Sequence, residues 1–495
     1  MQVNIWILIA FVIYLGVMIG IGIFFSKKSS NMSDYFLGGR QMGSWLTALS
    51  AQASDMSGWL IMGLPGAVYL SGVSSAWIAI GLGIGTYLNW KLVAKRLRNY
   101  SEVAGDAITI PQYFQNRFDS RSSAVRVVCA VIIFVFFLIY TASGFNAAAK
   151  LIENVFGIKY TIGLTIGAVV ILIYTFMGGY FAVVWTDFFQ GMLMFFALLI
   201  IPILAYFAVG SAEFAAITSA KTGYMNLMAN GSEPYAFSDL ISNLAWGLGY
   251  FGMPHILVRF MSIKSGDMIK KSRIIAMIWV IISLIASVAV GCVGYVYLKH
   301  TGIADLDAVS AETIFMVLVQ KLTPGLIAGF LLCAIVSAIM STSDSQLLVT
   351  ASAVTSDIYG VFAEKGTDEK TMLRLSRIAI AVVAIIAYVI ALNPNNTVMS
   401  LVSNAWAGFG AAFGPAMLLS LFWRRTTMNG VLTGMISGAL IVMVWNKYLA
   451  EPTGIYELLP AFFISLALIV VVSLLDKKPS KKVLDEFDKV NKLGI

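Results

Sequence analysis

The chain has 495 residues, of which 59% are hydrophobic and 12% are charged, with a formal net charge of +8. Soluble domains carry about 25% charged residues, so this composition excludes a soluble globular enzyme, a disordered chain and a disulfide scaffold, and it leaves a polytopic membrane protein. The surplus basic residues lie in short loops between apolar runs, which favours a topology signal over binding to nucleic acid.

Thirteen apolar runs are long enough to cross a bilayer, for which a helix needs about 20 residues. We therefore expect an all-α polytopic membrane protein with about 13 transmembrane helices, at 4–25, 44–72, 74–97, 127–156, 160–179, 188–210, 237–261, 273–298, 325–356, 373–392, 398–423, 430–448 and 455–475. The first run has no basic residue before it and no small-residue cleavage site, so it is predicted to be a retained helix. The run at 311–322 is too short to span, and we expect it on the outer surface.

The basic residues fall mainly on one side of these spans. With the N-terminus outside, 27 of the 33 Lys and Arg residues lie in inner loops or in the tail, and six lie outside. Cytoplasmic loops are enriched in Lys and Arg, so the predicted orientation is N-terminus out and C-terminus in. Residues 1–475 are expected to form one transmembrane domain, followed at 476–495 by a charged, solvated cytoplasmic tail.

Glycine and proline interrupt the second and seventh spans in the same pattern. The spacing Gly-x4-Gly-x-Pro begins at Gly58 and again at Gly247, 189 residues later. Glycine and proline are common in membrane helices, but these two spans run in opposite directions in the predicted topology. Such a pair indicates an inverted-repeat transporter. The predicted repeats cover about 44–210 and 237–423, with one extra helix before them and two after them.

Two aspartates interrupt the apolar runs. Asp55 lies at membrane depth in the second span, where a charged side chain costs about 2.5–3.5 kcal/mol on insertion scales and marks a functional site. Asp187 lies near the cytoplasmic start of the predicted sixth span. Its position is equally compatible with a helix N-cap and with a cation ligand.

The ninth span is unusually polar. It contains six hydroxyl residues between Ser337 and Thr350, with Asp344 among them. Four of its residues recur at helical spacing and therefore share one face: Ala338, Ser341, Thr342 and Ser345. Hydroxyl residues alone more often join helices by hydrogen bonds, but hydroxyl and carbonyl oxygens also bind hard cations. The adjacent carboxylate favours an ion.

Aromatic side chains lie deep in the spans beside the predicted breaks. They are Trp59, Tyr140, and the pair Trp246 and Tyr250, which share a helix face. Aromatic residues of membrane proteins usually form interfacial belts, and at these depths a substrate pocket is at least as good an interpretation. Such a pocket suits a compact substrate with an apolar ring or chain, and the N–H groups of a broken helix suit a carboxylate.

Five stretches resemble the sodium:solute symporter family: DYFLGGR (34–40), TALSAQASDMSGWLIMGLPGAVYLSG (47–72), SAWIAIGLGIGTYLNWKLVAKRLR (75–98), WGLGYFGMPHILVRFM (246–261) and WAGFGAAFGP (406–415). The resemblance covers nearly the whole chain. Its most specific segments, Ser-Asp-Met-Ser-Gly-Trp and Trp-Gly-x-Gly-Tyr-Phe-Gly-x-Pro-His, are similar to those of bacterial members that transport proline.

This resemblance implies the inverted-repeat fold of the leucine transporter. It also implies a secondary active transporter, not an enzyme, that imports L-proline coupled to inward sodium flow by alternating access. The implied location is the bacterial cytoplasmic membrane, with the lipid bilayer as surroundings, sodium as the coupling ion and no organic cofactor.

The resemblance further implies the site residues. The residues around sodium would be Ala53, Met56, Ala338, Ser341 and Thr342, with Asp55 nearby. Proline would lie among Ser57, Gly58, Trp59, Tyr140, Trp246, Tyr250 and Pro254. Arg40 matches a position associated with gating or coupling. Some family members bind a second sodium close to the Ser343-Asp344-Ser345 segment, and here we expect a second, inner cation site at Asp187, Asp344 and Ser345.

Several alternatives remain open at this point. The solute could instead be a betaine, pantothenate, a sugar or a carboxylate, and the coupling ion could be a proton carried by Asp55 or Asp344. An ion channel or a membrane sensor is a further alternative, although the tail is too short and too charged for a soluble output domain. The oligomeric state is left open.

Overall fold

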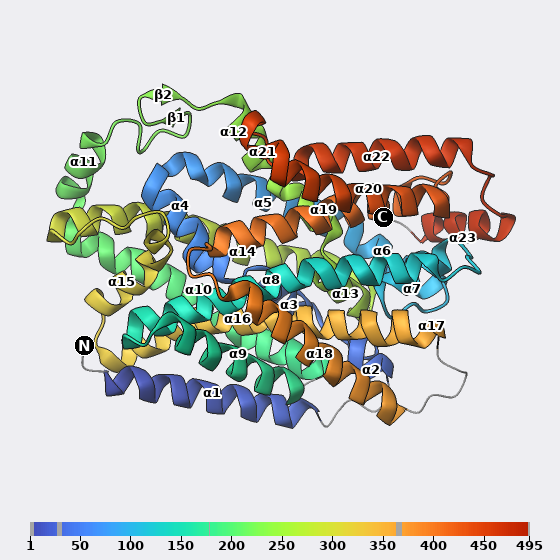
Figure 1. Cartoon of the computed structure of the whole chain (residues 1–495), viewed down its shortest axis with the longest axis horizontal. Helices are drawn as coiled ribbons and strands as arrows, with labels where there is room; N and C mark the ends of the chain where they lie inside the picture. The colour runs from blue at the N-terminus through green and yellow to red at the C-terminus, as the bar shows by residue number, and fades with distance from the viewer. Residues whose placement is uncertain (1–3, 27–31, 178, 363–368, 494–495) are drawn as a thin grey trace.

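The computed structural model describes residues 4–26, 32–177, 179–362 and 369–493. The predicted inner-loop residues Lys27 and Lys28, and the first part of the predicted inner loop at 365–377, lie outside the described residues. The described chain is almost entirely helical, and most of its helices run along the long axis of the molecule (Figure 1).

Among the described residues, nine helices are long and apolar enough to cross a membrane. They are α1 (Ile5–Ser26), α8 (Ala124–Phe156), α10 (Tyr180–Val209), α14 (Ile269–Thr301), α16 (Gly325–Ser352), α18 (Glu369–Ala391), α19 (Val398–Phe422), α20 (Met428–Tyr448) and α22 (Leu458–Leu475). Each of them corresponds to one predicted span.

The other four predicted spans are also helical. One is the continuous helix α9 (Tyr160–Met177). The second span is divided into α3 (Ser44–Asp55), a π-helical turn (Trp59–Gly63) and α4 (Leu64–Ser71). The third is divided into α5 (Ala76–Leu88), a π-helical turn (Asn89–Ala94) and α6 (Lys95–Val103), and the seventh into α12 (Phe237–Ala245), the 3-10 helix η5 (Trp246–Gly252) and α13 (Pro254–Ser262). The interruptions predicted in the second and seventh spans are confirmed.

The two broken spans run in opposite directions. Met42, just before α3, pairs with backbone groups just after α13: its N–H donates to the Ser262 carbonyl oxygen at 3.2 Å, and its carbonyl oxygen accepts from Lys264 N at 3.0 Å. The start of one span therefore lies beside the end of the other, as an inverted repeat requires. Helix α5 packs directly on η5, because a Cβ on Gly85 would lie 2.2 Å from the Gly247 carbonyl oxygen.

Short elements close the two ends of the bundle. They are α2 (Met32–Leu37), α7 (Ile110–Arg117), α11 (Ser211–Ala220), β1 (Ala229–Asn230), β2 (Glu233–Pro234), α15 (Ile314–Leu322), α17 (Gly360–Phe362) and α21 (Ala450–Thr453). Helix α15 corresponds to the run expected on the outer surface. It does not lie freely on that surface, because Ile314, Phe315 and Leu318 are fully buried.

The tail beyond α22 differs from the solvated end that its alternating charges suggested. It forms α23 (Lys481–Lys492), whose N-cap residue Ser480 accepts a hydrogen bond from Val483 N at 3.4 Å. Phe487 is only 4% exposed. Its ring lies 6.4 Å from the Tyr100 ring of α6, and 5.2 Å from the guanidinium carbon of Arg117 in α7. The tail is therefore an amphipathic helix, and its apolar face packs against α6 and α7.

Candidate ion and substrate site

The interruption between α3 and the π-helical turn, here called the first break, frees one backbone carbonyl for several donors. The interruption at η5 in the seventh span is called the second break. Helix α3 ends at Asp55, and Met56 leaves the helix with φ −79° and ψ 73°. Three groups then donate to the Asp55 carbonyl oxygen: Ser57 N at 2.9 Å, Trp59 Nε1 at 3.1 Å and the Tyr140 hydroxyl at 3.4 Å. These donors replace the partners that a continuous helix would supply.

Helix α16 crosses beside this break. The Ser341 hydroxyl donates to the Ala53 carbonyl oxygen at 2.8 Å. Thr342 Oγ1 is buried and has no hydrogen-bond partner among the described residues. The other two residues expected around sodium, Met56 and Ala338, are fully buried. The five residues therefore come from two elements in direct contact, and their oxygens are of the kind that hard cations bind.

The Asp55 side chain links the two broken spans. Its Oδ2 accepts a 2.6 Å hydrogen bond from the Tyr250 hydroxyl of η5, and the carboxylate is fully buried. Its Oδ1 has no hydrogen-bond partner within the described part of the chain. The Asp55 side chain thus binds Tyr250, a predicted substrate residue. The Asp55 backbone lies at the first break, between Ala53 and Met56.

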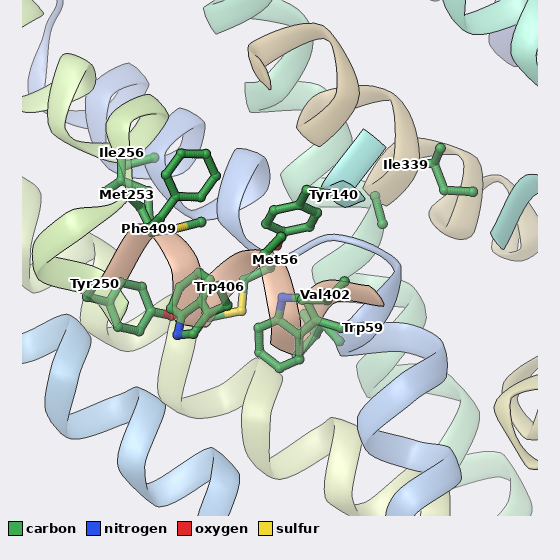
Figure 2. Packing of buried hydrophobic residues seen from close by; sticks show 14 of the residues in the cluster. Met56, Trp59, Tyr140, Tyr250, Met253, Ile256, Ile339, Val402, Trp406 and Phe409 are labelled. Carbon is green, nitrogen blue, oxygen red and sulfur yellow. The ribbon is translucent and has the colours of Figure 1, made fainter. Parts of the chain in front are cut away.

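Three of the four aromatic residues expected around the substrate, Trp59, Tyr140 and Tyr250, lie near this link (Figure 2). Trp59, Tyr140 and Tyr250 are each 1% exposed. Trp246 is also buried, and its ring stacks on Tyr456 with 5.3 Å between the centroids. Trp59 at the first break, Tyr140 of α8 and Tyr250 of η5 all donate to oxygens of Asp55. Together with Trp246, they are called the aromatic cluster below.

The remaining predicted substrate residues lie at the two breaks. The Ser57 hydroxyl is 3.5 Å from the Tyr140 hydroxyl. Gly58 precedes the π-helical turn, where a Cβ would lie only 3.3 Å from Cβ of Ala147. Pro254 begins α13, a position where its missing N–H costs no helical hydrogen bond. Pro254 is thus buried at the second break, four residues after Tyr250.

A buried arginine lies among the residues expected to form the second cation site. Arg259 of α13 donates from Nη2 to Asp187 Oδ2 at 3.2 Å and to the Ser345 hydroxyl, and from Nε to Ser50 Oγ at 3.1 Å. Asp344 Oδ1 accepts from Ser345 at 3.3 Å. Two oxygens, Asp187 Oδ1 and Asp344 Oδ2, have no hydrogen-bond partner in the described ranges. The guanidinium therefore binds Asp187 directly and is linked to Asp344 through the Ser345 hydroxyl.

The N-cap interpretation of Asp187 is wrong. Helix α10 begins at Tyr180, and its N-cap residue is Gly179. Asp187 therefore lies two turns inside the helix, where its Oδ2 accepts a 2.6 Å hydrogen bond from Ser50. The prediction starts the span too late because it treats Asp187 as the limit, although the residues from Tyr180 to Trp185 that precede it in α10 are apolar.

Arg40 joins several elements at one end of the bundle. Its guanidinium donates to four oxygens: Asp106 Oδ1 at 2.8 Å, Ser101 Oγ at 3.0 Å, the Met261 carbonyl at 2.7 Å and the Ala107 carbonyl at 2.8 Å. Burial lowers the pKa of the Arg40 guanidinium, and the Asp106 carboxylate opposes that shift. The end of the broken helix α13 is thereby fixed to the loop after α6.

A buried ion pair joins helices at the other end of the bundle from Arg40. Lys150 Nζ lies 2.8 Å from Glu312 Oε2, and the two side chains are 6% and 4% exposed. The Glu312 carboxylate also accepts from Val398 N at 2.9 Å and from Met399 N at 3.0 Å. A carboxylate at a helix N-terminus is favourable, so this pair holds the start of α19 against α8.

Sequence reasoning missed Arg259 and Lys150 as parts of the buried network. Both were counted as loop charges that report topology. The signal that could have found Arg259 is the presence of two acidic residues in neighbouring apolar spans, because a buried carboxylate requires a partner. The same argument applies to Lys150 and Glu312.

The chain matches the model of the sodium:solute symporter family over residues 35–438. A sodium/proline symporter of Staphylococcus aureus is 46% identical over 476 residues, which are 94% of this chain and 92% of that protein. The sodium/proline symporter of strain JH9 is 46% identical over 489 residues, with 97% and 94% covered.

Two solved structures share the fold. A Na+-coupled sialic acid symporter in a substrate-bound, outward-open state has a TM-score of 0.79 at 20% identity, with 97% of this chain and 99% of that chain covered. A nucleobase-cation-symport-1 family transporter in a closed conformation has a TM-score of 0.52 at 15% identity, with 93% and 99% covered.

Proposed function

This chain belongs to the sodium:solute symporter family, and we propose that it imports L-proline by coupling it to the inward flow of sodium. Its curated relatives at 46% identity are named sodium/proline symporters. The observation on this chain that carries the proposal is the contact between α16 and the first break, where the Ser341 hydroxyl reaches the Ala53 carbonyl oxygen at 2.8 Å.

The proposed sodium site lies at this contact. Sodium is held by the carbonyl oxygens of Ala53, Met56 and Ala338 and by the hydroxyl oxygens of Ser341 and Thr342. Two observations support this assignment: the Ser341 contact with α3, and the unpartnered, buried Thr342 Oγ1 within the described part of the molecule. Sodium replaces the direct hydrogen bond between the two helices, so its arrival fixes the position of α3 against α16.

The proposed substrate site lies on the other side of Asp55. Proline packs among Trp59, Tyr140, Trp246 and Tyr250, with its carboxylate at the N–H groups that follow the break. The hydrogen bond from Tyr250 to Asp55 transmits the position of the sodium-binding segment to the aromatic cluster. Sodium thus organises the pocket, and proline completes it before the broken helices move.

The proposed membrane arrangement has thirteen spans, with the N-terminus outside and the C-terminus inside a bacterial cytoplasmic membrane. The spans are the nine long helices, α9 and the three interrupted segments. An odd number of spans places the two ends of the chain on opposite sides of the membrane. In agreement, α1 starts at one end of the bundle and α23 lies at the other (Figure 1). Arg40 and its partners then lie inside, and the Lys150–Glu312 pair lies outside.

Proline uptake into proteoliposomes tests the function directly. We expect saturable uptake of L-[14C]proline that requires an inward sodium gradient. In Ser341→Ala the half-saturating sodium concentration should rise about tenfold or more, because an oxygen ligand to a charged group is lost. Ser337→Ala, one turn away on α16, is the matched control and should leave sodium dependence unchanged.

Two other outcomes would change the coupling ion or the solute. Uptake that persists when choline replaces sodium at fixed pH would indicate proton coupling. Sodium-dependent uptake of a betaine or a sugar, without proline uptake, would retain the sodium site and reject the substrate.

We also propose a second, inner cation site at Asp187, Asp344 and Ser345. The cluster contains two buried carboxylates and one guanidinium, so one negative charge lacks a counter-charge among the described side chains of this cluster. A buried charge without a partner is strongly unfavourable. A single monovalent cation at the free oxygens of Asp187 and Asp344 balances the cluster.

Asp344→Asn is expected to remove this second cation. The wild-type protein should show a sodium Hill coefficient near two, and the variant should show a coefficient near one with proline uptake retained. The neutral amide leaves the Arg259–Asp187 pair balanced, which is why the variant should remain folded. A wild-type coefficient near one that does not change in Asp344→Asn would rule out the second site.

A further inference from the structure

The motif Trp-Ala-Gly-Phe-Gly on α19 has no role in the function described so far. Its first residue, Trp406, is 1% exposed. The indole Nε1 donates to the Trp246 carbonyl oxygen at 2.7 Å, and the ring meets Tyr250 edge to face with 5.0 Å between centroids. Figure 2 shows Trp406 in the middle of the cluster, between Tyr250 and Met56. One side chain therefore contacts the backbone of Trp246 and the ring of Tyr250, both in η5.

The glycines of η5 provide the space for this contact. A Cβ on Gly249 would lie 1.9 Å from Trp406 Nε1, and a Cβ on Gly252 would lie 2.2 Å from the Phe409 carbonyl oxygen. Real Cβ atoms do not approach other atoms this closely. The glycine spacing of the second break thus serves a purpose beyond loosening the helix, because it allows η5 to lie against α19.

We propose that Trp406 is a positioning residue for the substrate. Its N–H fixes the backbone of η5 at Trp246, and its ring fixes the orientation of Tyr250. Trp406 acts through the backbone of Trp246 and the ring of Tyr250, and it thereby sets the affinity for the substrate. This inference rests on the proposed function, because Trp246 and Tyr250 form part of the proposed proline pocket.

The indole hydrogen bond has a specific consequence for affinity. Without the donor, a buried carbonyl at the pocket wall loses a partner, and both the 3-10 segment and the Tyr250 ring gain freedom. Such a loss corresponds to about a tenfold weaker interaction. The effect should appear in binding, since the sodium residues belong to α3 and α16 and not to α19.

Trp406→Phe tests this, because phenylalanine keeps an aromatic ring and removes the N–H. In proteoliposomes with an inward sodium gradient, the KM for proline should rise about tenfold, while Vmax stays within about twofold. The half-saturating sodium concentration, measured at saturating proline, should change less than the KM. Trp445→Phe is the control. The Trp445 indole Nε1 also donates to a backbone carbonyl, that of Ile455 at 3.1 Å, and both residues lie after the two predicted repeats.

Gly249→Ala tests the same contact from the other side. The added methyl group must displace the indole, so the KM for proline should rise as in Trp406→Phe. Gly83→Ala is its control, because a Cβ there meets only Leu284 Cδ1 at 3.9 Å.

The outcomes separate this inference from the proposed function. A fall in Vmax with unchanged KM in both Trp406→Phe and Gly249→Ala would assign Trp406 a purely structural role and overturn the inference. An unchanged KM and Vmax in both would do the same. Absence of sodium-driven proline uptake in the wild-type protein would instead overturn the proposed function.

Discussion

Asp55→Asn is expected to lower sodium-driven proline uptake by at least about 100-fold. Asp55 is buried, and one of its carboxylate oxygens binds Tyr250 at 2.6 Å while its backbone lies at the proposed sodium site. A carboxylate within about 6 Å of a bound monovalent cation contributes about 2–3 kcal/mol at an effective dielectric constant of about 20. The charge-assisted bond to Tyr250 adds about 1.5–3 kcal/mol. The amide variant loses most of both contributions at nearly constant volume.

The measurement is initial uptake against sodium concentration, at fixed proline and again at fixed sodium with proline varied. Both half-saturating concentrations should rise, since Asp55 connects the two sites. Asp267→Asn is a suitable control, because the Asp267 side chain is 90% exposed and lies 3.6 Å from Lys95. An Asp55→Asn protein with wild-type sodium dependence would show that this carboxylate does not act on the ion.

Tyr250→Phe refines the same prediction. The variant removes the hydroxyl donor and leaves the carboxylate, so its loss of activity should be about tenfold. In the double variant with Asp55→Asn the two effects should not add, because both substitutions break the same hydrogen bond. Additive losses would mean that Asp55 and Tyr250 act independently.

The breaks in the two repeats were predictable because their chemistry is local. Glycine loosens a helix, and proline inside a helix removes a backbone hydrogen bond, so the repeated spacing that includes Gly58 and Pro254 predicted the interruptions from the sequence alone. The polar face of α16 was also predictable, since helical spacing alone brings Ser341 and Thr342 to one side. The ion and the solute came from resemblance, because neither hydroxyl groups nor aromatic rings identify one ligand by themselves.

The partners of the buried charges could not be predicted in the same way. Arg259 lies near the end of the predicted span 237–261 and is counted as an inner-loop charge, yet it is 1% exposed and contacts three other helices. Trp406 carries no polar signal at all, and its role depends on the approach of α19 to η5. Both depend on packing between segments that are 72 to 209 residues apart in the chain, and no periodicity predicts such packing.

Arg259→Gln is expected to be the most destabilising of the substitutions considered. The guanidinium bonds to Ser50, Asp187, Ser345 and the His255 carbonyl oxygen, so it joins α13 to α3, α10 and α16. Its removal leaves two carboxylates in a buried cluster. Breaking a buried ion pair from one side costs about 3–5 kcal/mol, because the remaining charge is uncompensated.

Thermal unfolding of the purified protein in detergent measures this cost. Arg424→Gln is the matched control: Arg424 lies 2.8 Å from Asp488, and the two side chains are 53% and 43% exposed, so its loss should cost at most about 1 kcal/mol. Adding Asp187→Asn to Arg259→Gln should restore part of the lost stability, because it removes the stranded charge together with its partner. If Arg259→Gln unfolds at the same temperature as Arg424→Gln, the guanidinium is not the counter-charge that holds these four helices together.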